Sequence, residues 1–135
     1  MQQDFEWKNS YSVGHIVLDQ QHQQILDICK RASDCATGKS VDEDFHSTIN
    51  DLVEFSRMHY AYEESVLRGC AFHLLEEHVT EHREDMAKIL DFIHNSLSGT
   101  VNKVSLADYA LAWWKNHVLI SDMQYRSMVL AKGSD

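Results

Sequence analysis

Two short segments of this 135-residue chain decide its fold, HYAYE at 59–63 and HVTEH at 78–82. The first places a histidine four residues before a glutamate, and the second places two histidines four residues apart. Residues at positions i and i+4 share one face of an α-helix. If both segments are helical, each presents two metal-binding side chains in the same direction.

Apolar residues on both sides of these segments recur with the 3.6-residue period of an α-helix. The same period continues towards both ends of the chain and predicts four helices. They cover residues of about 18–37, 41–67, 72–97 and 105–131. The connections between them are short, which favours neighbouring helices that run antiparallel. The sequence therefore predicts an all-α fold, an up-down-up-down antiparallel four-helix bundle.

The segment before the first helix, residues 1–16, contains Phe5, Trp7 and Tyr11 and is expected to pack on the bundle as an N-terminal arm. No linker, repeat or block of like charge divides the chain, so residues 1–135 are expected to form one domain. On the last helix, the apolar period places His117 and Ile120 on the inner face.

Three glycines, at positions 38, 69 and 99, mark expected helix ends, because glycine often follows the last helical residue. Ser40 and Glu43 have the spacing of a capping box before the second helix. The three cysteines, Cys29, Cys35 and Cys70, are an odd number and are expected to be small apolar residues without a disulfide framework.

The chain carries 21 acidic against 12 basic residues, a net charge of −9. This balance argues against nucleic acid or an anionic membrane surface as a partner. No apolar run approaches the ~20 residues that a membrane span needs. The first residues, MQQDFEWKN, are polar and acidic and do not resemble a signal peptide, so we expect a cytoplasmic protein.

Polar residues interrupt the apolar stripes at positions where leucine or isoleucine would be expected. They are His22, His59, Glu63, His78, His82, His117 and Asp122. Each unsatisfied buried polar group costs roughly 1–3 kcal/mol. Seven of them would consume the roughly 5–15 kcal/mol that stabilises a domain. Something must therefore bind these side chains if they point inward.

Imidazole and carboxylate groups suit first-row metals such as iron, manganese or zinc. Seven ligands are too many for one such ion but suit two ions bridged by the two carboxylates. With a solvent-derived oxo or hydroxo bridge, this set gives one six-coordinate and one five-coordinate metal. The open position would take a small ligand. The set includes no evident general base, so we expect a binding protein and not an enzyme.

Four segments in order, LDQQH at 18–22, HYAYEE at 59–64, HVTEH at 78–82 and WWKNHVLISD at 113–122, resemble hemerythrin and the bacterial hemerythrin-like domains. The leading FEW and SVG resemble the N-terminal arm of that family, so the similarity extends over nearly the whole chain. The resemblance implies a non-haem centre of two iron ions that binds dioxygen reversibly at one iron.

The resemblance also implies a role for each residue. His78, His82 and His117 would bind the six-coordinate iron, and His22 and His59 the five-coordinate iron. Glu63 and Asp122 would bridge the two irons. The family usually has leucine three residues before the last histidine, close to the dioxygen site. Here Trp114 stands there and is expected to block, reshape or open the dioxygen pocket. The turn before HVTEH also lacks the Tyr-Pro of the family.

Around the site, Tyr60, Tyr62 and Tyr125 are candidates for hydrogen bonds to ligands, since metal-bound histidine usually donates its other N–H. Glu64 is expected to be solvated. Four further histidines lie outside the pattern and are interpreted as surface or ordinary packing residues. They are His15, His46, His73 and His94.

The leading functional hypothesis is an oxygen- or redox-sensing input domain of a larger signalling protein, such as a chemotaxis receptor or a diguanylate cyclase, with an output domain downstream. Its ligand would be dioxygen. The alternative is a free-standing carrier or store of dioxygen. A diiron oxidase or peroxidase of ferritin type is disfavoured, because such sites use about four glutamates and two Glu-x-x-His motifs. A metal-free bundle with buried histidines is the remaining hypothesis.

Overall fold

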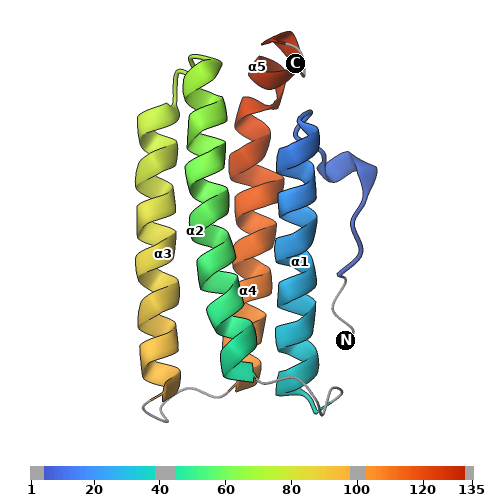
Figure 1. Cartoon of the computed structure of the whole chain (residues 1–135), viewed down its shortest axis with the longest axis vertical. Coiled ribbons are helices and arrows are strands. Elements are labelled where there is room, and N and C mark those ends of the chain that lie inside the picture. The colour runs from blue at the N-terminus through green and yellow to red at the C-terminus, as the bar shows by residue number, and fades with distance from the viewer. Residues whose placement is uncertain (1–4, 39–44, 98–102, 133–135) are drawn as a thin grey trace.

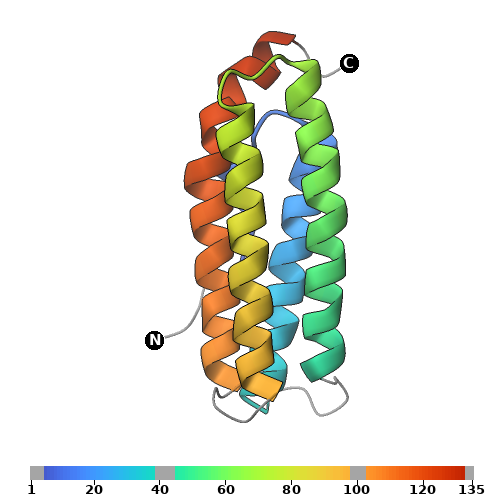
Figure 2. The ribbon, with the colours of Figure 1, turned by 90° about the vertical axis from the view of Figure 1, so that its left-hand side faces the viewer.

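The computed structural model describes residues 5–38, 45–97 and 103–132. Four long helices lie side by side and alternate in direction (Figure 1). They are α1 (Ile16–Ala36), α2 (Phe45–Gly69), α3 (Leu75–Leu97) and α4 (Lys103–Asn116). This arrangement confirms the predicted all-α, up-down-up-down four-helix bundle. The turned view in Figure 2 shows that α1 lies between α2 and α4, and that α3 closes the square on the other side.

The predicted arm precedes α1 and runs along the outside of the bundle (Figure 1). It contains a short 3-10 turn, η1 (Asn9–Tyr11). Trp7 and Tyr11 contact Trp114 of α4 edge to face, with ring centroids 6.5 and 5.8 Å apart. Edge-to-face contacts between aromatic rings are favourable. The arm is therefore held on the bundle by aromatic packing.

Two apolar clusters fill the bundle, one on each side of the buried polar residues. On α1, Leu18 belongs to the smaller cluster and Ile25 to the larger, and His22 lies between them. On α2, Leu67 belongs to the smaller cluster and Tyr60 to the larger. The polar residues thus occupy a layer that apolar side chains cover from both ends of the bundle.

The last helix was predicted over about 105–131, and the chain is helical there, but it is not one regular α-helix. After α4 come a π-helical turn, η2 (His117–Ser121), a 3-10 turn, η3 (Asp122–Tyr125), and a short helix, α5 (Arg126–Lys132). The backbone N–H of Asp122 donates to the carbonyl of His117, five residues earlier. This hydrogen bond defines a π turn, a feature found frequently at functional sites.

The π turn changes which residues face inward. In a regular α-helix, residues five apart are about 140° apart around the axis. The wider turn instead brings Asp122 to the same buried side as His117. Ile120, expected on the inner face, is 62% exposed, and Ser121 is buried. The wider turn therefore moves Ile120 off the inner face and brings the carboxylate of Asp122 onto it.

Two residues in the connections between helices have a positive φ, Gly38 and Ala71. Gly38 follows α1 with a φ of 78°, as expected for a helix end. In the turn between α2 and α3, the positive φ falls at Ala71, at 55°. The capping box of Ser40 and Glu43 and the helix end at Gly99 lie outside the described residues. No helix within the described ranges is long and apolar enough to cross a membrane.

The contact between Gly14 and α5 can be tested by Gly14→Ala. Gly14 has a φ of 85°, and an added Cβ would lie 2.7 Å from Cδ2 of Leu130. Gly38→Ala is a matched control, because its φ is 78° and no described atom lies within 4 Å of the added Cβ. A positive φ costs a non-glycine residue about 1–2 kcal/mol. We expect Gly14→Ala to lower the free energy of unfolding by more than Gly38→Ala, measured by urea denaturation.

The excess should disappear when Leu130→Ala is combined with Gly14→Ala, because the smaller side chain leaves room for the added Cβ. Equal losses in the two glycine variants would mean that α5 moves away from the arm without cost.

Candidate metal centre

Side chains from α1, α2, α3 and the two turns after α4 converge on the buried polar layer. All seven predicted ligands are there, with 0–3% of their surface exposed. Their ligand atoms form two groups, within each of which all atoms lie within 4.8 Å of one another. One group is Glu63, His78, His82, His117 and Asp122. The other is His22, His59, Glu63 and Asp122.

Glu63 belongs to both groups, and its two oxygens face different histidines. Oε1 lies 2.8 Å from Nε2 of His78 and 2.8 Å from Nε2 of His82. Oε2 lies 3.2 Å from Nε2 of His59 and 3.5 Å from Nε2 of His22. A carboxylate that offers one oxygen to each of two groups of imidazoles has the arrangement needed to bridge two cations.

The two carboxylate oxygens of Asp122 also face different histidines. Its Oδ1 lies 3.0 Å from Nε2 of His78. Its Oδ2 lies 3.0 Å from Nε2 of His22 and 3.3 Å from Nε2 of His117. The π turn is what brings this carboxylate opposite Glu63, because the turn carries Asp122 to the side of His117. Two carboxylates are thus enclosed by five imidazoles.

The carboxylates control the protonation of the imidazoles around them. Burial alone would lower the pKa of His22 and His78, but Asp122 and Glu63 outweigh it and raise these pKa values to about 9 and about 10. Burial favours the neutral form of Glu63, yet the surrounding histidines hold its pKa well below the usual range. For His117, burial dominates and lowers the pKa to about 4. Protons on His22 and His78 therefore supply positive charge between the carboxylates.

Protons do not satisfy the whole cluster. Within the part of the chain that the structure describes, several buried ligand atoms face an imidazole or a carboxylate but do not form a hydrogen bond with it. They are Nε2 of His22, His59, His82 and His117 and both carboxylate oxygens of Asp122. Leaving one such group unpaired costs roughly 1–3 kcal/mol. Imidazole nitrogen and carboxylate oxygen together suit first-row metal ions. The residues present therefore fit two such ions.

A second layer of side chains orients the ligands from behind. The Nδ1–H of His59 donates to Oε1 of Gln21 at 2.7 Å, and the Nδ1–H of His82 donates to Oε2 of Glu64 at 2.8 Å. The hydroxyl of Tyr125 donates to Oε2 of Glu63 at 3.0 Å. Such outer hydrogen bonds fix the orientation of metal-binding imidazoles and carboxylates.

Of these partners, the sequence predicted only Tyr125. Glu64 was expected to be solvated, and this was wrong, because its side chain is 23% exposed and holds His82. Gln21 was missed, although it precedes His22 and is buried, which is unusual for glutamine. Tyr60 makes no such hydrogen bond to a ligand but stacks on the ring of His82, with centroids 4.0 Å apart and planes at 14°.

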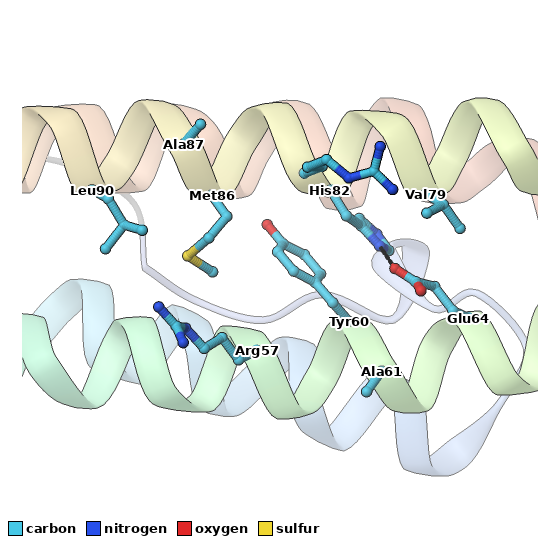
Figure 3. Close-up of a pocket in the computed structure, with 10 residues that line it drawn as sticks. Arg57, Tyr60, Ala61, Glu64, Val79, His82, Met86, Ala87 and Leu90 are labelled. Atoms are coloured by element: carbon cyan, nitrogen blue, oxygen red, sulfur yellow. Dashed lines mark hydrogen bonds and ion pairs between the residues drawn. The ribbon is translucent and has the colours of Figure 1, made fainter.

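The stacked rings line a groove of about 520 Å³ between α2 and α3. Figure 3 shows Tyr60 reaching from α2 towards α3, and a dashed line marks the hydrogen bond between Glu64 and His82. Met86 and Leu90 line the groove farther along α3. The groove therefore reaches the ring of His82, a residue of the polar layer.

Trp114 is 1% exposed and belongs to the larger apolar cluster. Its indole N–H donates to the backbone carbonyl of His22 at 2.9 Å, and its ring packs against the arm. Its neighbour Trp113 stacks on the ring of His117, with centroids 5.7 Å apart. Trp114 therefore fills space beside His22, and its role in a dioxygen pocket stays a prediction.

The four histidines outside the pattern lie away from the cluster. His15 caps α1 by accepting the N–H of Leu18 at 3.4 Å. His46, His73 and His94 are exposed. These positions agree with their interpretation as surface or packing residues. All three cysteines are free thiols, and Cys29 is buried.

A four-helix bundle that encloses five histidines and two carboxylates has the composition of a cation-binding helical bundle, and comparison with known proteins identifies which kind. Residues 14–129 match the family described as the Hemerythrin HHE cation binding domain. The chain belongs to the hemerythrin family.

Individual proteins named as hemerythrins are also similar to this chain. The chain is 30% identical to a myohemerythrin from Riftia pachyptila over 122 residues, which are 90% of this chain and 91% of that protein. It is 21% identical to a bacteriohemerythrin from Clostridium acetobutylicum, over 90% of this chain and 98% of that protein. A crystal structure of wild-type hemerythrin matches the fold with a TM-score of 0.80 at 18% identity, over 92% of this chain and 96% of the other.

The raised pKa values predict that metal uptake releases protons. At pH 7 the metal-free chain holds protons on His22 and His78, whose pKa values are about 9 and about 10. A metal ion must displace both, and the carboxylate of Glu63 also raises the pKa of His82, so we expect release of at least two protons per chain and an affinity that rises with pH up to about 10. Titration of the metal-free protein with Zn²⁺ in weak buffer at pH 7 measures the release.

The same shifts make the metal-free protein sensitive to alkali. Stability from protonated His22 and His78 is fully present below the ordinary pKa of 6.5 and is lost as pH rises through about 9 and about 10. The variant His78→Gln should release about one proton fewer than the unaltered chain. Metal uptake at pH 7 without proton release would contradict this protonation state.

Proposed function

We propose that this protein is a non-haem diiron domain that binds dioxygen. The proposal depends on the position of Glu63 between two groups of histidines. Its Oε1 faces His78 and His82, and its Oε2 faces His59 and His22. A bridging carboxylate between two imidazole groups is what a pair of iron ions requires. Myohemerythrin and bacteriohemerythrin relatives support iron as the metal.

In this proposal, His78, His82 and His117 bind one iron, and His22 and His59 bind the other. Glu63 and Asp122 would be shared by the two irons, together with an oxo or hydroxo group from solvent. The iron held by three histidines would then have six ligands. The iron held by two histidines would have one fewer, which would leave room for dioxygen.

When bound, the iron pair supplies reversible binding of dioxygen, and the chain supplies the surroundings. The two apolar clusters exclude water from both ends of the polar layer. Gln21 and Tyr125 hold His59 and Glu63 in place through hydrogen bonds of 2.7 and 3.0 Å. Such a site binds its ligand without net reaction, in keeping with a binding protein and not an enzyme.

We favour a sensory role for the domain, as a cytoplasmic input to an output domain downstream. Trp114 supports this role, because it fills space beside His22, whose iron would hold dioxygen. A crowded pocket limits stable storage of dioxygen and favours readout through the oxidation state of the irons. Carriage of dioxygen is the second candidate, and the similarity to myohemerythrin over 91% of its length favours it.

The ligand set is tested by His117→Ala, with His94→Ala as the control on an exposed histidine of α3. After anaerobic loading with Fe²⁺, we expect two irons in the unaltered protein and in His94→Ala. We expect fewer in His117→Ala, together with loss of the colour that forms on exposure to dioxygen. Full iron content in His117→Ala would remove His117 from the ligand set.

Iron loading should also raise the thermal stability, because a ligand that binds only the folded state adds about 2.7 kcal/mol at 100 times its Kd. An unchanged melting temperature after removal of metal would favour a metal-free bundle with buried histidines.

The role of Trp114 is tested by Trp114→Leu. The smaller side chain leaves room beside His22 and removes the hydrogen bond to its carbonyl. We expect a longer-lived oxygenated form, measured from the decay of its visible absorption in air. Trp114→Phe is the control, since it removes the same N–H but retains an aromatic ring. A shorter lifetime in Trp114→Leu would mean that Trp114 shields the site from solvent, which suits a carrier.

A further inference from the structure

Two carboxylates on α3 lie behind the ring of His117, on the side away from the polar layer. Oε1 of Glu81 and Oδ2 of Asp85 are each 3.9 Å from Nδ1 of His117. Nε2 of the same ring lies 3.3 Å from Oδ2 of Asp122. Glu81 and Asp85 are four residues apart, so they share one face of α3. The ring of His117 therefore lies between acidic groups on both sides.

Three buried polar atoms at this place have no hydrogen-bond partner among the described residues. They are Nδ1 of His117, Oδ2 of Asp85 and Nε1 of Trp113. Two of them are ring nitrogens that can donate an N–H, and the third is a carboxylate oxygen that can accept. Trp113 stacks on His117, and its indole N–H lies close enough to Asp85 to favour the charged form of that carboxylate. The three atoms are chemically complementary.

Glu81 differs from Asp85 in already having a partner. The hydroxyl of Ser121 donates to Oε1 of Glu81, and the side chain of Glu81 is 33% exposed. The side chain of Asp85 is 16% exposed. A separation of 3.9 Å is too long for a direct N–H···O hydrogen bond, which spans 2.7–3.2 Å, and suits one water molecule or a small rotation of the ring. Asp85 is thus the carboxylate available to His117.

The ligands on α2 and α3 show what such a partner does. His59 and His82 each donate Nδ1–H to an oxygen, of Gln21 and Glu64 respectively. An imidazole whose Nδ1 carries the proton has its Nε2 lone pair free for a metal ion. His117 needs the same tautomer, because its Nε2 faces the polar layer.

We propose that Asp85 is the positioning residue of His117, holding the Nδ1–H tautomer and the ring orientation, directly or through one water molecule, with Trp113 on the same carboxylate. The proposal rests on the proposed function only in taking His117 as a metal ligand. It gives three of the five imidazoles a polar side chain behind Nδ1, each from a different residue type.

The test uses Asp85→Ala and Asp85→Asn, with Glu84→Ala as the control on an exposed acidic residue next in sequence. The probe is Co²⁺, whose visible absorption reports ligand geometry and whose affinity is measured by competition with a chelator. We expect Asp85→Ala to weaken binding by about 10–100-fold, as loss of such a partner typically does, and to change the Co²⁺ spectrum. Asp85→Asn retains an acceptor and should fall between Asp85→Ala and the unaltered protein. Glu84→Ala should not change.

The melting temperature of the metal-free protein separates positioning from mere packing. Because Oδ2 of Asp85 makes no direct hydrogen bond, we expect Asp85→Ala to change that temperature too little to account for the weaker binding of Co²⁺. Unchanged Co²⁺ affinity and spectrum in Asp85→Ala would overturn the proposal. A fall in metal-free stability that accounts for the lost affinity would overturn it too, as would a larger effect of Glu81→Gln.

These outcomes are independent of the dioxygen reaction. If the iron-loaded protein does not bind dioxygen but Asp85→Ala weakens Co²⁺ binding, the proposed function fails and the role of Asp85 stands. If the iron-loaded protein binds dioxygen and Asp85→Ala behaves as the unaltered chain, the function stands and the role of Asp85 fails.

Discussion

The burial of two carboxylates among five imidazoles is the constraint on which the rest of this structure depends. Charged groups removed from water need compensating charge and hydrogen bonds, or the fold loses more than it gains from its apolar core. The bundle meets this need in three ways. Histidine protons offset the carboxylate charge, outer side chains such as Gln21 and Tyr125 satisfy some of the polar atoms, and apolar clusters lie on either side of the layer. Metal ions, as proposed above, would satisfy the ligand atoms that are left.

Much of this was readable from the sequence, because helical periodicity and the four-residue spacings are local properties. His59 with Glu63, and His78 with His82, determine a face whatever the helices pack against. The π turn was not readable, since an α-helical period puts Ile120 inside and leaves Asp122 off the inner face. The spacing of five residues between His117 and Asp122 was the feature of the sequence that indicated a wider turn. Asp122 was predicted to face inward with the other six residues, and this is correct, although a regular α-helical register from His117 would not place it there.

The outer layer was harder to predict for a different reason. An acidic residue beside a ligand can face solvent or turn to an imidazole, and a rotation of a fraction of a helical turn decides between them. Glu64 and Asp85 both look like ordinary surface acids in the sequence, and both lie behind a histidine of the cluster. The groove between α2 and α3 is lined by Tyr60 and by His82, a residue of the polar layer, and the two rings stack on each other.

The π turn has a consequence for how this protein tolerates changes in length. Because η2 accommodates one residue more than an α-helical turn would, deleting any residue between His117 and Asp122 would restore a regular helix. A spacing of four residues in a regular helix also keeps the carboxylate on the side of His117, so the residues that follow would keep their faces. Tyr125 would still face Glu63, and α5 would keep its direction around the axis. A deletion within α4, before the turn, would instead rotate everything after it by about 100° relative to the residues before it. The π turn is therefore a place where the helix can lose one residue while the side chains on both sides of it stay in register.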